Sequence, residues 1–233
     1  KAFKMDGLGN DFVIIDQRYN TIDLSKNQII KICDRNYIGC DQLILIKKDE
    51  ITDAELEFYN SDGSISGACG NGTRCVADLL AKENKKAEIT LWTSGGILKS
   101  KILGKNLVET EIGIPKTNWS DIPLSENLDT KNLNIKILDK NNKEHAGGTA
   151  INVGNPHVVF FVENIEDYNL AKIGPEIENH KFFPKKCNVT LAKVVNSNLV
   201  KVRVWERGAG LTKACGTAAC ATAVAGNING LIE

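Results

Sequence analysis

Hydrophobic residues alternate with polar ones, or run together as β-branched residues, in short segments along most of the chain. Both patterns are typical of β-strands. In the first half they predict strands near residues 13–16, 42–46, 54–59, 88–92, 97–103 and 107–113. In the second half they predict strands near residues 145–153, 157–162, 188–195 and 200–205.

Helical periodicity is less frequent and predicts three helices. The first runs from Leu24 to Arg35, with Ile29 and Cys33 on one face, and two others begin just after Cys69 and Cys215. The segment after Cys215, GTAACATAVAG, has small apolar residues on all sides, which predicts a helix buried within its own domain. A sheet wrapped round that helix would bury it, so we expect an α+β fold.

The chain repeats itself at an offset of about 146 residues. FYNSDGSISGACGNG at 58–72 aligns with VWERGAGLTKACGTA at 204–218, which places Cys69 on Cys215. With a one-residue slip, GNDFVIID at 9–16 aligns with GNPHVVFF at 154–161, and Gln42 falls on Asn188. The shared order predicts an internal duplication into two pseudo-symmetric domains, each a mixed or antiparallel sheet round a central helix.

The boundary between the two domains is expected in IPKTNWSDIP at 114–123, where two prolines bracket a polar stretch. We therefore divide the chain into domains at residues 1–116 and 117–233. After its cysteine-led helix the first copy continues with three strand-like runs, whereas the second copy ends at Glu233. The second domain is thus expected to be C-terminally incomplete.

Composition narrows the class of partner. Lys and Arg together number 29, as do Asp and Glu, so the net charge is zero and nothing indicates nucleic acid or an anionic membrane as partner. A small molecule is the expected partner. Seven cysteines, an odd number, without a signal peptide or an apolar run of transmembrane length, favour a reducing cytoplasm.

The two cysteines at helix starts are candidates for acid–base chemistry. Unpaired N–H groups at a helix N-terminus favour a thiolate and can also hold a carboxylate, and the glycine after each cysteine allows close approach. If the two halves pack about a pseudo-two-fold axis, Cys69 and Cys215 face each other across a cleft with one carbon between them. The active site is therefore expected in that cleft.

One thiolate and one thiol on opposite faces of a carbon next to a carboxylate can invert it. The thiolate removes the α-proton, and the thiol returns a proton to the other face. The negative charge that grows on the carboxylate would be stabilised by the two helix N-termini. This chemistry predicts an amino acid racemase or epimerase.

Other uses of the cysteines remain open. Cys69 with Cys75, and Cys215 with Cys220, form two close pairs that could bind zinc, although their unequal spacings do not favour a structural zinc site. A zinc or thiol-redox binding module is therefore an alternative, as is a catalytically silent amino acid binder. The other cysteines are interpreted as packing residues.

Six motifs, in order and over nearly the whole chain, resemble the diaminopimelate epimerase family. They are KMDGLGNDFVIID, GCDQLILI, FYNSDGSISGACGNGTRC, GNPHVVFF, CNVTLAKV and WERGAGLTKACGTAAC. The related proline racemases share paired cysteines but not this combination of motifs. A racemase of another amino acid, such as proline, is the alternative within this class.

The resemblance implies an isomerase that interconverts LL-2,6-diaminoheptanedioate and its meso form. It implies a reaction of lysine and peptidoglycan precursor biosynthesis that needs neither pyridoxal phosphate nor a metal or other cofactor. Members of the family are often homodimers, so a homodimer is a further expectation.

The resemblance also implies roles for individual residues. Cys69 and Cys215 match the two acid–base thiols, with Gly70, Asn71, Gly216 and Thr217 as donors near the reacting carboxylate and amine. The residues that match substrate-holding positions are Asn10, Gln42, Asn60, Asn155, Asn188, Glu206 and Arg207. A guanidinium suits the carboxylate at the far end of such a substrate. His157 either tunes a thiol from behind or is only hydrogen-bonded locally.

Overall fold

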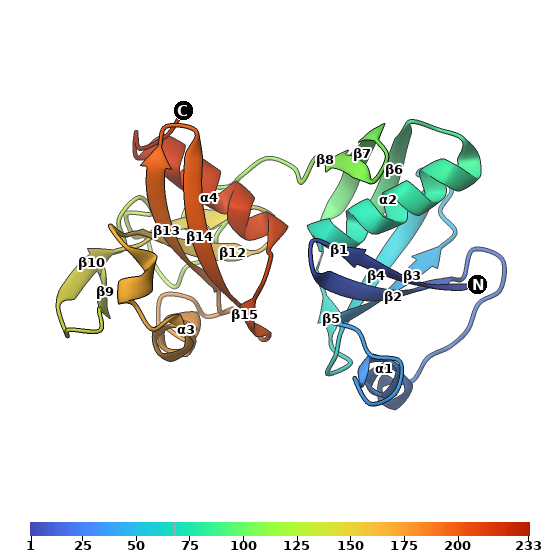
Figure 1. Cartoon of the computed structure of the whole chain (residues 1–233), viewed down its shortest axis with the longest axis horizontal. Coiled ribbons are helices and arrows are strands. Elements are labelled where there is room, and N and C mark those ends of the chain that lie inside the picture. Colours follow the sequence, from blue (N-terminus) through green and yellow to red (C-terminus); the bar gives the residue numbers. More distant parts are fainter. Residues whose placement is uncertain (68) are drawn as a thin grey trace. The chain divides into compact units, whose positions relative to one another are not determined.

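The computed structural model of the chain describes residues 1–67 and 69–233, and Ala68 in the repeated motif lies outside the described residues. The chain divides into two compact units, unit 1 at Lys1–Gly113 and unit 2 at Ile114–Glu233 (Figure 1). Both units combine a sheet with helices, so the fold is α+β. Each unit is described by itself.

Unit 1 is built on one eight-stranded sheet, ordered β1-β2-β3-β4-β6-β7-β8 with β5 paired to β4. The pairs β2·β3 and β4·β6 are parallel, and the remaining pairs are antiparallel. The strands are β1 (Ala2–Gly7), β2 (Asn10–Asp16), β3 (Gln42–Lys47), β4 (Ala54–Asn60), β5 (Ile65–Ser66), β6 (Glu88–Thr93), β7 (Gly96–Gly104) and β8 (Leu107–Thr110).

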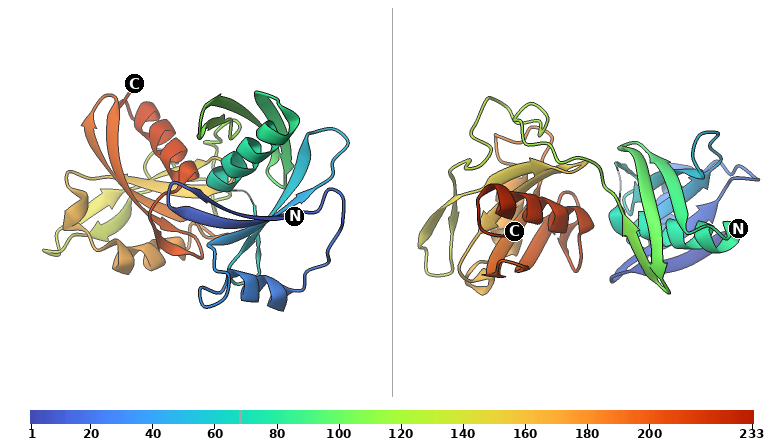
Figure 2. Two further views of the ribbon diagram at one scale, coloured as in Figure 1. Left: turned by 45° about the vertical axis from the view of Figure 1, so that its right-hand side comes forward. Right: turned by 90° about the horizontal axis from the view of Figure 1, so that it is seen from above.

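Two helices cover the two faces of this sheet (Figures 1 and 2). Alternation along β2 sends Phe12 and Ile14 into the core under α2 (Gly70–Asn84), and Val13 into the core under α1 (Lys26–Cys33). Helix α1 begins at Ser25, which forms a capping box with Gln28. Helix α2 contacts both β1 and β8, the two edge strands, so the sheet curves round it.

Unit 2 contains a five-stranded sheet, ordered β11-β12-β13-β14-β15, and a separate β9·β10 hairpin. Its strands are β9 (Ile135–Leu138), β10 (Glu144–Gly147), β11 (Thr149–Asn152), β12 (Pro156–Phe161), β13 (Asn188–Asn196), β14 (Leu199–Glu206) and β15 (Gly210–Thr212). Its helices are the 3-10 turn η1 (Ile165–Asp167), α3 (Leu170–Glu178) and α4 (Gly216–Ile228).

The strand pairing of the two units is the same. Both β1 to β5 and β11 to β15 pair in the order antiparallel, parallel, antiparallel, antiparallel. Leu43 pairs with Tyr59, as Val189 pairs with Trp205 at the offset of 146. Phe12 pairs with Gln42, as His157 pairs with Asn188, so the first parallel strand is offset by one residue less. This is the slip seen in the sequence.

Two of the predicted elements take a different form in the structure. The single strand expected at 145–153 is broken at Gly148, where φ is +102° and the chain leaves β10 for β11. Helix α4 was expected to be buried on all sides, but Ala219, Ala223 and Asn227 are exposed. Helix α4 packs chiefly against β11, β12 and β13, so the five-stranded sheet covers one of its faces.

The segment interpreted as a linker packs into unit 2. Ile122 is fully buried and belongs to the core cluster that includes Phe160 and Leu191, and Trp119 packs against that cluster. The backbone of Lys116 forms an antiparallel bridge with Asn152. Burial of these apolar side chains therefore fixes the segment to unit 2.

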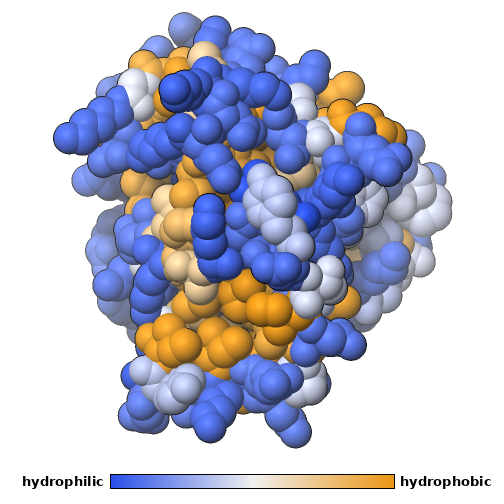
Figure 3. Space-filling view, turned by 90° about the vertical axis from the view of Figure 1, so that its right-hand side faces the viewer, coloured by the Kyte–Doolittle hydropathy of each residue, from blue (hydrophilic) through white to orange (hydrophobic). Residues whose placement is uncertain are grey.

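The surface seen from the right-hand side of Figure 1 is mostly hydrophilic, with hydrophobic residues gathered in a few patches (Figure 3). The exposed large hydrophobic residues of unit 1 include Tyr37, Ile51 and Ile97. Among the described residues, none of the helices is long and apolar enough to span a membrane.

Candidate active site

Three predicted substrate-binding residues of unit 1 lie at neighbouring ends of the inner strands β2, β3 and β4. Asn10 begins β2 and Gln42 begins β3, and these strands are parallel. Asn60 ends β4, which runs antiparallel to β3 and pairs Asn60 with Gln42. The Gln42 Nε2 donates to Asn60 Oδ1 at 3.0 Å. The topology thus gathers amide groups at the strand ends near the start of α2.

The same construction recurs in unit 2. Asn155 directly precedes β12 and Asn188 begins the parallel strand β13, while Glu206 ends the antiparallel strand β14. Glu206 therefore occupies the place that Asn60 holds in unit 1. The end of β14 in unit 2 therefore carries a carboxylate, whereas the end of β4 in unit 1 carries an amide.

Cys69 is the N-cap residue of α2, with φ −139° and ψ 109°. Its thiol donates to Asn10 Oδ1 at a sulfur–oxygen distance of 3.6 Å, and Asn71 Nδ2 donates to the same oxygen at 3.4 Å. A Cβ on Gly70 would meet only Arg74 Nη1, at 3.8 Å, so there is open space beside the first turn. Because the first N–H groups of a helix have no intrahelical acceptor, this space suits an anion.

Cys215 is the N-cap residue of α4, with φ −133° and ψ 110°, nearly the same backbone geometry as Cys69. Its Sγ lies 3.3 Å from Thr217 Oγ1. Burial, together with the negative charge of Glu206, raises the pKa of the Cys215 thiol to about 12. Hydrogen bonds from Thr217 and the Ala218 backbone lower the pKa, but by less.

The expectation of a lowered thiol pKa at a helix start is therefore wrong for Cys215. The hydrogen bonds available at the helix N-terminus do not offset burial beside a carboxylate. Cys215 consequently stays protonated at neutral pH.

His157 is fully buried and hydrogen-bonded to the predicted substrate-binding residues around it. Its Nε2 lies 2.8 Å from Asn155 Oδ1 and 3.5 Å from Asn188 Nδ2. Burial lowers the pKa of His157 to about 3, and the positive charge of Arg207 acts in the same direction. The imidazole is therefore neutral, and its Nε2–H donates to Asn155, whereas Asn188 Nδ2 donates to the Pro156 carbonyl at 3.0 Å.

Arg207 is held by two hydrogen bonds within unit 2. Its backbone N–H donates to Asn188 Oδ1 at 3.0 Å, and its guanidinium Nη1 donates to the Lys185 carbonyl at 2.9 Å. The residue is exposed. The structure thus brings Arg207 together with Asn188, and leaves its guanidinium accessible.

Two acidic residues that the sequence analysis missed orient predicted site residues. Asp41 Oδ2 accepts from Asn10 Nδ2 at 2.8 Å. The buried carboxylate of Glu178 accepts from the Trp205 indole N–H at 2.7 Å and from the Gly208 backbone at 3.2 Å, which fixes the turn that carries Glu206. Asp41 lies beside Gln42 in a quoted motif, whereas no motif marked Glu178.

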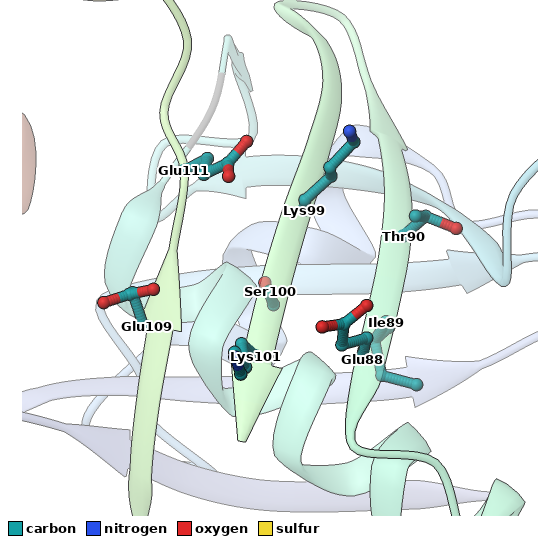
Figure 4. Close-up of a pocket in the computed structure, with 8 residues that line it drawn as sticks. All are labelled: Glu88, Ile89, Thr90, Lys99, Ser100, Lys101, Glu109 and Glu111. Carbon is teal, nitrogen blue, oxygen red and sulfur yellow. The ribbon is translucent and has the colours of Figure 1, made fainter. Parts of the chain in front are cut away.

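A surface hollow over β6, β7 and β8 lies among charged side chains, including Glu88, Lys99, Lys101, Glu109 and Glu111 (Figure 4). None of the predicted site residues lines it. Ligand sites are usually apolar clefts with a few polar groups, whereas Glu and Lys side chains predominate among the residues that line this hollow. We therefore do not place the site there.

The zinc alternative lacks a ligand set. Within residues 1–67 and 69–233, three or more His, Cys, Asp or Glu side chains do not come together as ligands of a metal ion. Cys75 is buried in the core of unit 1, and burial raises the pKa of its thiol to about 11. A structural zinc site requires about four such ligands, deprotonated at cysteine.

The family profile and the similar sequences described below point to the same protein family. The sequence profile described as diaminopimelate epimerase matches residues 2–117 and 149–233. The diaminopimelate epimerase of Pelagibacter ubique (strain HTCC1062) is 74% identical over 233 residues, which span 100% of this chain and 85% of the relative. That of Acidiphilium cryptum (strain JF-5) is 44% identical over 98% of this chain and 81% of the relative.

Solved structures resemble the fold at low sequence identity. A hydroxyproline epimerase from Agrobacterium vitis, with bound trans-4-hydroxy-L-proline, has a TM-score of 0.68 at 13% identity and covers 100% of this chain and 78% of that one. A PhzF-family phenazine biosynthesis protein of Bacillus anthracis has a TM-score of 0.61 at 15% identity, over 97% of this chain and 79% of that one. These similarities concern the fold alone.

Proposed function

Since the chain belongs to the diaminopimelate epimerase family, we propose that Cys69 and Cys215 are the two thiols that carry out its reaction. The chain has diaminopimelate epimerase function, an isomerase activity of lysine biosynthesis. The observation that carries the assignment of the thiols is the matched placement of Cys69 and Cys215 as N-cap residues with nearly equal backbone angles.

The reaction inverts the α-carbon of LL-2,6-diaminoheptanedioate to give the meso form. A thiolate at Cys69 removes the α-proton, and the thiol of Cys215 delivers a proton to the opposite face. This assignment is supported by the raised pKa of Cys215, which keeps it protonated at neutral pH. In the reverse direction the two groups exchange roles.

The charge that develops on the reacting carboxylate is stabilised by backbone donors. Gly70 and Asn71 at the start of α2, and Gly216 and Thr217 at the start of α4, supply N–H groups whose helix ends favour negative charge. No cofactor is required for these steps, because the base, the acid and the electrostatic stabilisation all come from the chain.

The ends of the strands hold the remainder of the substrate. Glu206 and the amide oxygens accept from ammonium groups, and the exposed guanidinium of Arg207 pairs with the distal carboxylate. The residues in these roles are Asn10, Gln42, Asn60, Asn155, Asn188, Glu206 and Arg207. His157 holds Asn155 in place by donating from its Nε2 to Asn155 Oδ1.

The finer description of the fold is part of the same proposal. The two pseudo-symmetric copies, residues 1–116 and 117–233, derive from an internal duplication, and the active site lies in a cleft between them. Their common strand pairing and the constant offset of the register support the duplication. A cytoplasmic location is supported by the cysteine content, and a homodimer by the family alone.

Exchange of the α-hydrogen in deuterated water tests the substrate. We expect the protein to introduce deuterium at the α-carbon of LL-diaminopimelate and to form the meso isomer, with L-proline unchanged under the same conditions. Exchange into proline at a comparable rate, or tight binding of diaminopimelate without exchange, would refute this assignment.

A further inference from the structure

The loop between α1 and β3 covers a pair of thiols. Cys33 ends α1, and Cys40 lies two residues before β3. Their sulfur atoms are hydrogen-bonded at 3.5 Å. The side chains are only 3% and 1% exposed, whereas residues 34–38 above them are exposed. Neither thiol takes part in the proposed reaction, and unit 2 has no cysteine at the position equivalent to Cys40, which is Lys186.

The turn brings the two cysteines together because of Gly39. Its φ is +75°, and a Cβ at this position would lie 3.0 Å from the Arg35 Cα. The Gly39 N–H donates to Ile32 O at 3.0 Å and the Cys40 N–H to Cys33 O at 3.2 Å. The backbone thus holds the pair in register, and the sulfurs need to approach by about 1.5 Å to reach a covalent S–S distance.

A chain of hydrogen bonds leads from this loop to Cys69. The Arg35 guanidinium binds Asp11 at 2.7 Å and Asp41 at 2.6 Å. Asp41, the neighbour of Cys40, accepts from Asn10 Nδ2 at 2.8 Å, and Asn10 Oδ1 accepts from Cys69 Sγ at 3.6 Å. A shift at Cys40 is therefore two hydrogen bonds away from the proposed catalytic thiol.

We propose that Cys33 and Cys40 form an oxidation site that hydrogen peroxide closes into a disulfide, and that closure lowers turnover by displacing Asp41 from Asn10. The Cys40 thiolate attacks the peroxide, so that an S–O bond forms, the O–O bond breaks and hydroxide leaves. The Cys33 thiol then attacks the sulfenic acid of Cys40, and the S–S bond forms with release of water. The two thiols lose two electrons, and the peroxide is reduced to two waters.

The surroundings of the two sulfurs favour Cys40 as the attacking group. The hydrogen bond with Cys33 is the largest cause of the lowered pKa of Cys40. A backbone hydrogen bond at Val13 and the charge of Lys4 add to it, and burial and the charge of Asp11 oppose it. The same hydrogen bond and burial raise the pKa of Cys33. Burial of both sulfurs disfavours a bulky oxidant.

The bond itself is tested without reference to activity. The Cys69→Ser/Cys215→Ser chain is treated with hydrogen peroxide, alkylated and digested. We expect a cross-linked peptide joining residues 33 and 40, an intact mass lower by two hydrogen atoms, and reversal by dithiothreitol. The same chain with Cys33→Ser is the control and should form no such link. An unmodified pair, oxidation of Cys40 to a sulfinate, or a link that forms only in denaturant would overturn the proposal.

The effect on turnover rests on the proposed function and is tested separately. The chain with all its cysteines and the Cys33→Ser chain are exposed to the same peroxide, and the dithiothreitol-reversible loss of epimerisation is compared. We expect a loss about tenfold larger when the pair is present, because small displacements of site residues are costly. An equal loss would overturn the regulatory part. Cys40→Ser is the second variant, and thermal unfolding verifies that each variant is folded.

Discussion

The starts of α2 and α4 share a backbone but differ in the polar group beside the cysteine. The φ and ψ angles of Cys69 and Cys215 agree within a few degrees. Cys69 donates to the amide of Asn10, whereas Cys215 lies by the carboxylate of Glu206, where unit 1 has Asn60. The same backbone geometry therefore supports two electrostatic environments, as the proposed two-base reaction requires of one thiol that starts as acid and one that starts as base.

The sheet side chains that face the two helices also differ, in size and in polarity. A Cβ on Gly72 of α2 would lie 2.7 Å from Ile44 Cδ1, 3.0 Å from Phe58 and 3.2 Å from Phe12. In unit 2 the corresponding helix residue is Ala218, which is fully buried, and the corresponding sheet residues are Thr190, Val204 and His157. Smaller or polar side chains in the second sheet make room for the alanine methyl group.

The largest expected effect comes from removing either thiol. Cys69→Ser or Cys215→Ser should lower epimerisation of LL-diaminopimelate by about 10²–10⁴-fold, since each removes the group that moves a proton. Turnover measured with purified variants, together with α-deuterium incorporation, checks this. Cys220→Ser, one turn into α4, is the matched control and should retain activity. Normal turnover in both of the first two variants would remove the two-thiol account.

Glu206→Gln should make the Cys215 site resemble its counterpart in unit 1. Loss of the carboxylate charge should lower the pKa of Cys215 from about 12 toward its ordinary value of 9.0, because that charge is among the causes that raise it. The pH dependence of alkylation of Cys215, measured in a Cys69→Ser background, should shift to lower pH. Turnover should fall by about tenfold or more, as expected when a general acid is mismatched.

The control for charge alone is Glu166→Gln, because Glu166 is exposed and pairs with Arg203 at 3.6 Å on the surface. It should leave the alkylation profile unchanged. A profile that moves equally in both variants, or in neither, would show that Glu206 does not set the protonation of Cys215.

The close contact under α2 predicts a stability difference between the units. Gly72→Ala should destabilise the protein by about 1–3 kcal/mol, because the methyl group overpacks against Ile44 and Phe58. The reverse substitution at the equivalent position of unit 2, Ala218→Gly, should lower the free energy of unfolding by about 1 kcal/mol, because glycine has a lower helix propensity than alanine. Urea unfolding of both variants measures the two values. A stabilised Gly72→Ala protein would contradict the packing described here.

His157 predicts an acid-sensitive unit 2. Its pKa is lowered from 6.5 to about 3 in the folded chain, so below pH 6.5 the unfolded chain binds a proton that the folded chain does not. Stability from this group is present above pH 6.5 and falls by up to about 1.4 kcal/mol for each pH unit below it. In His157→Phe, which introduces the residue found at Phe12, the slope of unfolding free energy against pH should be flatter. An unchanged slope would exclude His157 as the source.

Local patterns were enough to predict much of the fold. β-Branched runs predicted β3 and β13, alternation predicted β4, and the one-residue slip between the two copies reappears in the strand register. Helix α3 was missed because Gly174 and Pro175 interrupt its helical pattern. Gly174 is accommodated by packing instead, since a Cβ there would lie 2.6 Å from the Trp205 side chain.

The chemistry of the site depended more on tertiary contacts than on motifs. The motifs placed Cys69 and Cys215 at helix starts, but the pKa of Cys215 depends on burial and on the folding of Glu206, which ends β14 in the same motif, back against the thiol. The roles of Glu178 and Asp41 likewise arise from side-chain contacts across elements. A single sequence carries no local pattern for such contacts.

The central claim is that the sulfurs of Cys69 and Cys215 act on opposite faces of one α-carbon. A crystal structure with an unreactive diaminopimelate analogue bound tests it most directly. We predict both Sγ atoms at about 3–3.5 Å from the α-carbon, one on each face, with its carboxylate at the two helix starts. A complex in which only one sulfur reaches that carbon, and another group stands on its opposite face, would contradict the account.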